Sequence, residues 1–131
     1  MGNAIVKIRD KYMLWSTSWD KPVGWAMTQQ QFVDFYRVRH GNAAMGDWYG
    51  MGDFQRRMDR VEDTGCSMIA ETLDEFIVAN RAGPDETELT MDEIYEEYCT
   101  GDNVMPDDLA RDIRRVAAAM SELQVWEVSD E

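Results

Sequence analysis

The stretch "YMLWSTSWDKPVGWAMTQQQF", residues 12–32, changes from a strand pattern to a helix pattern, and this change decides the fold class. The segment "YMLWSTS" is aromatic and alternating, and "VGWAM" follows the turn-like "WDKP", as expected for two strands. Thr28 and Gln31 then form a T-x-x-Q capping box, which marks the start of a helix. The stretch therefore predicts a β-rich N-terminal piece that gives way to helices at residue 28.

Upstream of this stretch, "AIVKI" (residues 4–8) is short and β-branched and predicts a further strand. We therefore expect residues 1–27 to form a two- or three-stranded antiparallel piece. Pro22 has no N–H to donate to a ladder, so it belongs in a turn or at a sheet edge. Trp15 and Trp25 occupy strand positions, and we expect them in the core.

Downstream, "FVDFYRVRH" predicts a helix that stops at Gly41. His40, the only histidine, is expected to have a structural role at the C-terminal end of this helix, where it complements the dipole. On a helical wheel, one side carries Phe32, Phe35 and Tyr36, and the opposite side carries Gln30, Asp34 and Arg37.

The next segment, "GNAAMGDWYGMGD" (residues 41–53), has four glycines in thirteen residues and predicts a loop. Asp53 is expected to cap a short helix that ends at Gly65. Apolar residues recur along that helix at i, i+4 and i+7, and they are Phe54, Met58 and Val61.

Three more helices are predicted from start and stop signals. A capping box at residues 72–75 precedes "LDEFIVANRAG", which stops before Gly83-Pro84, although "EFIVA" also fits a strand. A box at residues 90–93 opens a helix that Gly101 closes. Pro106, at a first helical position, opens the longest helix. Its apolar stripe is Leu109, Ile113, Val116, Ala117, Met120 and Leu123.

The sequence as a whole predicts one α+β domain over residues 1–131, with a small N-terminal antiparallel β piece packed against about five helices. Residues 1–27 are β-rich, residues 28–124 are helical, and residues 125–131 form a tail in which "QVWEV" could add an edge strand. With 44% apolar residues, a chain of this length can bury a core without disulfides. Cys66 and Cys99 have no CxxC partner, so we expect two reduced thiols.

The location of the protein is predicted from two absent signals. No run of apolar residues is long enough to span a membrane. The N-terminal "MGNAIVKIRDKYMLW" lacks the basic region and long apolar run of a secretory signal. We therefore expect a cytoplasmic protein.

Charge is distributed unevenly along the chain, whose net charge is −13. Residues 1–60 carry nine Lys and Arg and six Asp and Glu, whereas residues 61–131 carry four Arg and twenty acids. Such a field opposes direct binding to nucleic acid or to an anionic membrane, because both are themselves negative. It favours a basic protein as partner, most simply one that handles nucleic acid.

The acids are densest in "DETELTMDEIYEEYCTGD", residues 85–102, which has eight carboxylates and no Lys or Arg. The wheel separates its apolar residues from its acids, as in an ordinary helix with one solvated face. Local stability does not explain the acids, because Asp92/Glu96 and Glu93/Glu97 are like-charged pairs at i, i+4. A polyanionic face that meets a basic partner is the alternative, and its residues would be Asp85, Glu86, Glu88, Asp92, Glu93, Glu96 and Glu97.

Known catalytic and metal-binding patterns are missing. No EF-hand spacing is present, and the lone His40 is not part of a Glu-x-x-His pair, so no metal or other cofactor is expected. The sequence contains no GxSxG, HExxH, P-loop or Rossmann motif. We therefore expect a protein that is not an enzyme.

An alternative function rests on the aromatic residues of the glycine-rich segment. Trp48 and Tyr49 are candidate exposed anchors for a partner, and Trp19 beside Asp20 is another. Residues 41–53 could instead serve a small-ligand binder or an enzyme.

"YMLWSTSWDKPVGWAMT" followed by "NRAGPDE" resembles a pattern in small uncharacterised accessory proteins of actinobacterial phages. The resemblance covers about a quarter of the chain and implies a bacterial host cytoplasm. It also implies an inhibitor of a host or defence protein, such as an anti-CRISPR-like counter-defence protein that occupies a basic nucleic-acid groove. Together with the charge pattern, it leads us to expect a non-enzymatic, acidic protein-binding inhibitor or regulator that acts as a nucleic-acid mimic.

Overall fold

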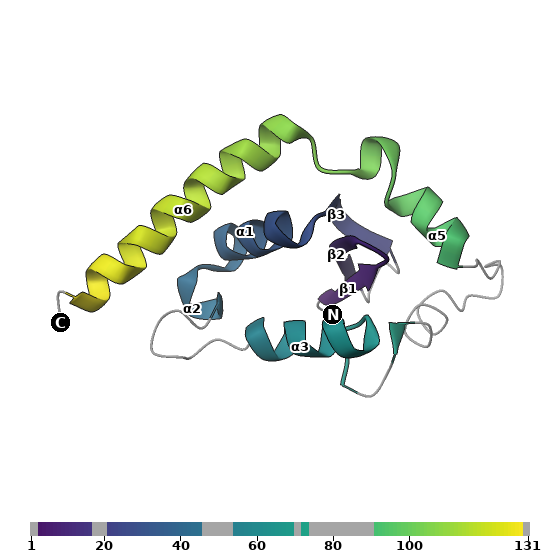
Figure 1. Ribbon diagram of the computed structural model, residues 1–131, viewed down its shortest axis with the longest axis horizontal. Helices are drawn as coiled ribbons and strands as arrows, with labels where there is room; N and C mark the ends of the chain where they lie inside the picture. Colours follow the sequence, from purple (N-terminus) through teal and green to yellow (C-terminus); the bar gives the residue numbers. More distant parts are fainter. Residues whose placement is uncertain (1–2, 17–20, 46–53, 70–71, 74–90, 130–131) are drawn as a thin grey trace.

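The computed structural model describes residues 3–16, 21–45, 54–69, 72–73 and 91–129 (Figure 1). Three strands come first: β1 (Asn3–Ile8), β2 (Lys11–Ser16) and β3 (Lys21–Met27). Helices follow in these ranges: α1 (Gln29–His40), α2 (Asn42–Met45), α3 (Phe54–Thr64), α5 (Met91–Tyr98), the 3-10 helix η1 (Gly101–Asn103) and α6 (Asp107–Ser129). The predicted α+β class is confirmed in outline. Four helices of this described part are longer than one turn, slightly fewer than the five expected.

The strands form one antiparallel sheet in the order β1-β2-β3, which confirms a three-stranded piece. Pro22 lies on β3, an edge strand of this sheet, as predicted, and is paired there with Trp15 of β2. Two distant segments partly cover the sheet edges, because Cys66 bridges to Val6 of β1 and Val104 bridges to Ala26 of β3. Such cover protects exposed strand edges from pairing with other chains.

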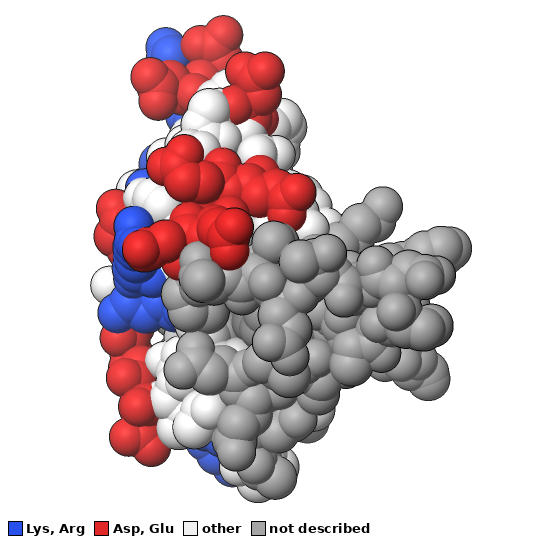
Figure 2. All heavy atoms as spheres, turned by 90° about the vertical axis from the view of Figure 1, so that its right-hand side faces the viewer, with Lys and Arg blue, Asp and Glu red and all other residues white. Residues whose placement is uncertain are grey.

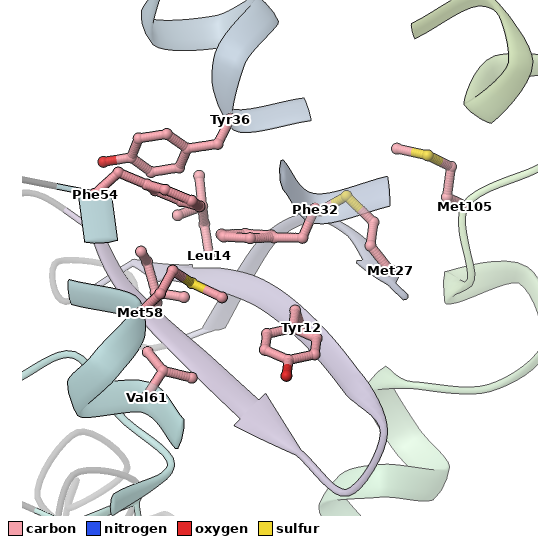
Figure 3. Close-up of a cluster of buried hydrophobic side chains, with 10 residues drawn as sticks. Tyr12, Leu14, Met27, Phe32, Tyr36, Phe54, Met58, Val61 and Met105 are labelled. Carbon is pink, nitrogen blue, oxygen red and sulfur yellow. The ribbon is translucent and has the colours of Figure 1, made fainter. Parts of the chain in front are cut away.

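Both faces of the sheet are buried, so β2 is inaccessible from Tyr12 to Ser16. On one face Trp15 is fully buried, as predicted, in a cluster with Ile94 and Cys99. On the other face, side chains of α1, α3 and the segment before α6 pack against the sheet, and Trp25 is half-buried beside them (Figure 3). This second cluster comprises Ile5, Tyr12, Leu14, Met27, Phe32, Tyr36, Phe54, Met58, Val61 and Met105.

Helix α1 begins with the predicted capping box. The Gln31 N–H donates to the Thr28 hydroxyl oxygen at 3.2 Å, and the Thr28 N–H donates to the Gln31 side-chain oxygen at 3.0 Å. These reciprocal bonds satisfy two of the backbone donors that a helix start leaves open. Phe32 and Tyr36 are buried, as the wheel predicts.

Asp34, on the side of the wheel opposite Phe32, Phe35 and Tyr36, is also buried. Helix α6 packs along α1 (Figure 1) and covers the side on which Asp34 lies. The buried carboxylate is compensated there: Arg114 of α6 donates to its Oδ1 at 2.7 Å, and the Gln30 amide donates to the same oxygen at 3.0 Å. A buried charge is tolerated only with such partners.

Two segments are helical where the sequence predicts otherwise. Residues 42–45 of the predicted loop form the single turn of α2. Residues 125–129, predicted as a tail with a possible edge strand, continue α6 to Ser129, since no Gly or Pro interrupts that helix after Pro106. Pro106 itself precedes α6, and its carbonyl accepts the Ala110 N–H at 2.9 Å. The stripe on α6 is only partly covered, because Val116 is 48% exposed.

Helix α3 runs as predicted, with Phe54, Met58 and Val61 buried and Gly65 directly after its last residue. Gly65 has φ +87°, and a Cβ atom there would lie 2.8 Å from the Cβ of Leu73.

We therefore expect Gly65→Ala to lower the free energy of unfolding by more than the roughly 1–2 kcal/mol that a left-handed backbone costs a non-glycine residue. Gly41→Ala is the matched control, because Gly41 also has φ +87° but faces open space. Chemical denaturation of both variants separates the clash from the backbone effect. Equal losses would contradict the close packing of Leu73.

Candidate protein-interaction surface on helix α5

Helix α5 is held against the sheet by its apolar side. Ile94 is fully buried and Cys99, just after the helix, is 1% exposed in the cluster around Trp15. The Tyr98 ring meets the Trp15 ring edge-on, with 5.6 Å between centroids. This separation of apolar and acidic sides confirms the predicted wheel.

The C-terminal end of α5 is also fixed. The Thr100 hydroxyl donates to the Glu96 carbonyl and the Asn103 amide donates to the Glu97 carbonyl, each at 2.7 Å. These bonds satisfy carbonyls that a helix end leaves open. The following segment is tied to β3, because the Met105 N–H donates to the Ala26 carbonyl at 3.0 Å. These contacts therefore fix the position of the helix that carries the acids.

The outer side of α5 is acidic. Asp92, Glu93, Glu96 and Glu97 are all exposed and together line a shallow surface depression. Figure 2 shows Asp and Glu atoms gathered on the face that carries α5, with Lys and Arg atoms beside them. The structure thus brings together four of the seven predicted acidic residues.

A basic group from the first hairpin partly balances these acids. Arg9, in the turn between β1 and β2, forms an ion pair with Asp92, and its guanidinium lies 4.7 Å from the centre of the Tyr95 ring. The Tyr95 hydroxyl donates to Asp10 of the same turn at 3.1 Å. Compensation is therefore concentrated at one end, since no described Lys or Arg pairs with Glu96 or Glu97.

Sequence reasoning missed this contact with the hairpin. The acidic stretch has no cation of its own, and Arg9 comes from the other end of the sequence. Its positive φ of 57° is uncommon for a residue other than glycine and belongs to the tight turn between paired Ile8 and Lys11. The only available signal was the charged pair Arg9-Asp10 between two predicted strands.

Five predicted site residues lie outside the described part of the chain, as do the candidate Trp19, the Asp53 cap and the helix predicted after residue 72. The five are Trp48, Tyr49, Asp85, Glu86 and Glu88.

Both cysteines are free, as predicted, and both are buried. Burial raises the pKa of the Cys99 thiol to about 11, so this thiol stays protonated at neutral pH. A protonated, buried thiol is a poor nucleophile. Cys99 therefore contributes packing beneath α5.

A second polar cluster joins the hairpin to α3. Glu62 accepts hydrogen bonds from the Tyr12 hydroxyl and from Lys7, the latter at 2.9 Å. These two bonds, that of Tyr12 first, lower the pKa of Glu62. The hydrogen bond to Glu62 raises the pKa of Lys7. The pKa of Tyr12 is also raised, mainly by burial and to a smaller extent by its hydrogen bond to Glu62.

These shifts predict a stability that falls at both pH extremes. The contribution of Glu62 to the free energy of unfolding is complete above its ordinary pKa and is lost as acid protonates the carboxylate. The contributions of Lys7 and Tyr12 are lost when alkali deprotonates these two side chains. We expect Glu62→Gln to flatten the acid side of a plot of unfolding free energy against pH. The control is Asp63→Asn, an exposed acid on the same helix. An unchanged acid side in Glu62→Gln would contradict the role of this carboxylate.

No helix among the described residues is long and apolar enough to cross a membrane. No group of three or more His, Cys, Asp and Glu side chains in the same ranges is placed to hold a metal ion.

Comparison with known proteins gives no relative: no family model, no curated protein and no solved structure matches this chain.

Proposed function

We propose that this protein is a non-enzymatic inhibitor or regulator that binds a basic protein through the acidic face of α5. The observation that carries the proposal is the exposure of Asp92, Glu93, Glu96 and Glu97 on one side of a helix whose other side is locked into the core. Like-charged neighbours at i, i+4 cost local stability, so a partner of opposite charge supplies a reason for them.

The charge density of α5 supports a partner that handles nucleic acid. Eight helical residues span about 12 Å, so four carboxylates give roughly one charge per 3 Å. One strand of B-DNA carries about one charge per 3.4 Å. Although Asp92 is paired to Arg9, Glu96 and Glu97 are exposed and no described Lys or Arg pairs with them, so they can meet Lys and Arg side chains that otherwise hold phosphates.

The biological setting belongs to the same proposal. The resemblance to phage accessory proteins supports a counter-defence role, anti-CRISPR-like in that the protein blocks a nucleic-acid-binding surface in the bacterial cytoplasm. The negative charge of the chain favours competition with nucleic acid for that surface over direct binding to it.

Affinity capture from nuclease-treated bacterial lysate tests the proposal with three baits at about 0.15 M salt. Wild type and a control variant are expected to retain the same basic nucleic-acid-handling protein, and an α5 variant is expected to lose it. The α5 variant carries Asp92→Asn, Glu93→Gln, Glu96→Gln and Glu97→Gln, and the control carries Asp59→Asn, Asp63→Asn, Asp107→Asn and Glu122→Gln. Both remove four exposed acids. Identical proteins on all three baits would make the α5 face a merely solvated surface.

A further inference from the structure

A cluster of Arg and His side chains lies at the opposite end of the molecule from α5, where α1 ends and α3 begins (Figure 1). Arg39 and His40 are the last two residues of α1, and Arg57 lies in the first turn of α3. Phe54 joins the two helices, because its ring lies 4.5 Å from that of Tyr36, centre to centre. Such a grouping of basic side chains is unexpected in a chain whose net charge is −13.

Tyr36 is the centre of the cluster. Its hydroxyl oxygen accepts a hydrogen bond of 2.7 Å from Arg57, and its ring centre lies 4.3 Å from that of His40. Figure 3 shows this hydroxyl directed away from the apolar side chains around Phe32. Because the oxygen is the acceptor from Arg57, the hydroxyl hydrogen remains able to donate, and no described residue accepts it.

The electrostatic surroundings of His40 are positive. Its pKa is lowered, first by burial and then by the charges of Arg39 and Arg57. Some other described arginines pair with acids, as in Arg9 with Asp92 and Arg114 with Asp34. No described carboxylate pairs with Arg39 or His40. The cluster therefore combines positive charge with hydrogen-bond donors. No described anion is paired with Arg39 or His40.

We propose that Arg39, His40, Tyr36 and Arg57 form a binding site for the phosphate group of a small molecule such as a phosphate monoester or a diphosphate. Arginine presents a planar fork of N–H donors that matches phosphate oxygens, and protonated imidazole donates from both ring nitrogens. The Tyr36 hydroxyl adds a donor on a rigid, buried ring. The site borders residues 41–53 on both sides in the sequence, and it does not depend on the acidic face of α5.

Binding at this site is coupled to the protonation of His40. The Tyr36 ring lies beside His40, and the charges of Arg39 and of Arg57 on α3 disfavour its charged form. The Arg39 guanidinium lies 6.0 Å from the centre of the Phe35 ring on the same helix. A bound phosphate reverses this field and favours imidazolium, so the pKa of His40 rises on binding. By linkage, phosphate binds more tightly as the pH falls through the pKa of His40.

Because His40 is the only histidine, its imidazole NMR signals report this coupling without ambiguity. The pH titration of full-length protein is recorded in inorganic pyrophosphate and in sodium chloride at matched ionic strength. We expect the pKa of His40 to be about one unit higher in pyrophosphate. Arg39→Gln should remove most of that difference, whereas Arg111→Gln, a charge-matched change on α6, should leave it intact.

Two results would overturn the proposal: the same His40 pKa in pyrophosphate and in chloride, or the same pyrophosphate effect in Arg39→Gln and Arg111→Gln. Arg39 and Arg111 are both exposed, so neither change should unfold the protein. The ring-current shifts of Tyr36 and Phe54 in the same spectra check that the cluster is intact.

Discussion

Replacing Phe32 with alanine is expected to lower the free energy of unfolding by about 3–5 kcal/mol, the usual loss for a buried phenylalanine. Phe32 is fully buried, and its ring centre lies 6.1 Å from that of Tyr12 on the sheet and 6.3 Å from that of Phe54 on α3. It also lies 5.9 Å from Tyr36 within α1. One side chain thus joins three elements (Figure 3), and its removal leaves a cavity between them.

Urea denaturation measures this loss, with Val38→Ala as the control on the same helix. Val38 is 38% exposed, so its truncation should change stability by no more than about 0.5 kcal/mol. If Phe32→Ala loses as little as Val38→Ala, the cluster between α1, α3 and the sheet is not the main core.

The α5 variant is expected to bind the captured partner between about 5-fold and 700-fold more weakly than wild type. Exposed ion pairs contribute roughly 0.2–1 kcal/mol each, so four of them amount to about 1–4 kcal/mol. Calorimetric titration with the purified partner measures the change. The control variant, neutralised on α3 and α6, should bind within about threefold of wild type, because its acids lie on other elements.

The fold of the α5 variant should be intact, since Ile94 and Cys99, which hold this region in the core, are unchanged. Neutralising two like-charged i, i+4 pairs should even stabilise the helix slightly, while loss of the Arg9–Asp92 pair acts in the opposite direction. A large drop in thermal stability would mean that weaker binding reflects unfolding and not lost contacts.

Local sequence signals predicted the elements well where a single helix or strand decided the outcome. The capping box at Thr28 and the i, i+4, i+7 pattern from Phe54 correspond to real helices, and the wheel separated Ile94 from the acids around it. These signals depend only on near neighbours along the chain, so the sequence contains all the information that they need.

Tertiary contacts were beyond the reach of the sequence. A wheel describes one helix, so it could not show that α6 packs against α1 and brings Arg114 to Asp34. In the same way, the acids of α5 seemed to lack a cation until the hairpin turn placed Arg9 beside Asp92. Long-range partners of this kind leave no local pattern in the sequence.

The affinity of the purified partner as a function of salt tests the central claim most directly. Between about 0.05 and 0.2 M salt, binding through the acidic face of α5 should weaken steeply for wild type and for the control variant, and much less for the α5 variant. If all three proteins show the same dependence of log Kd on log salt concentration, the carboxylates of α5 do not form the binding surface.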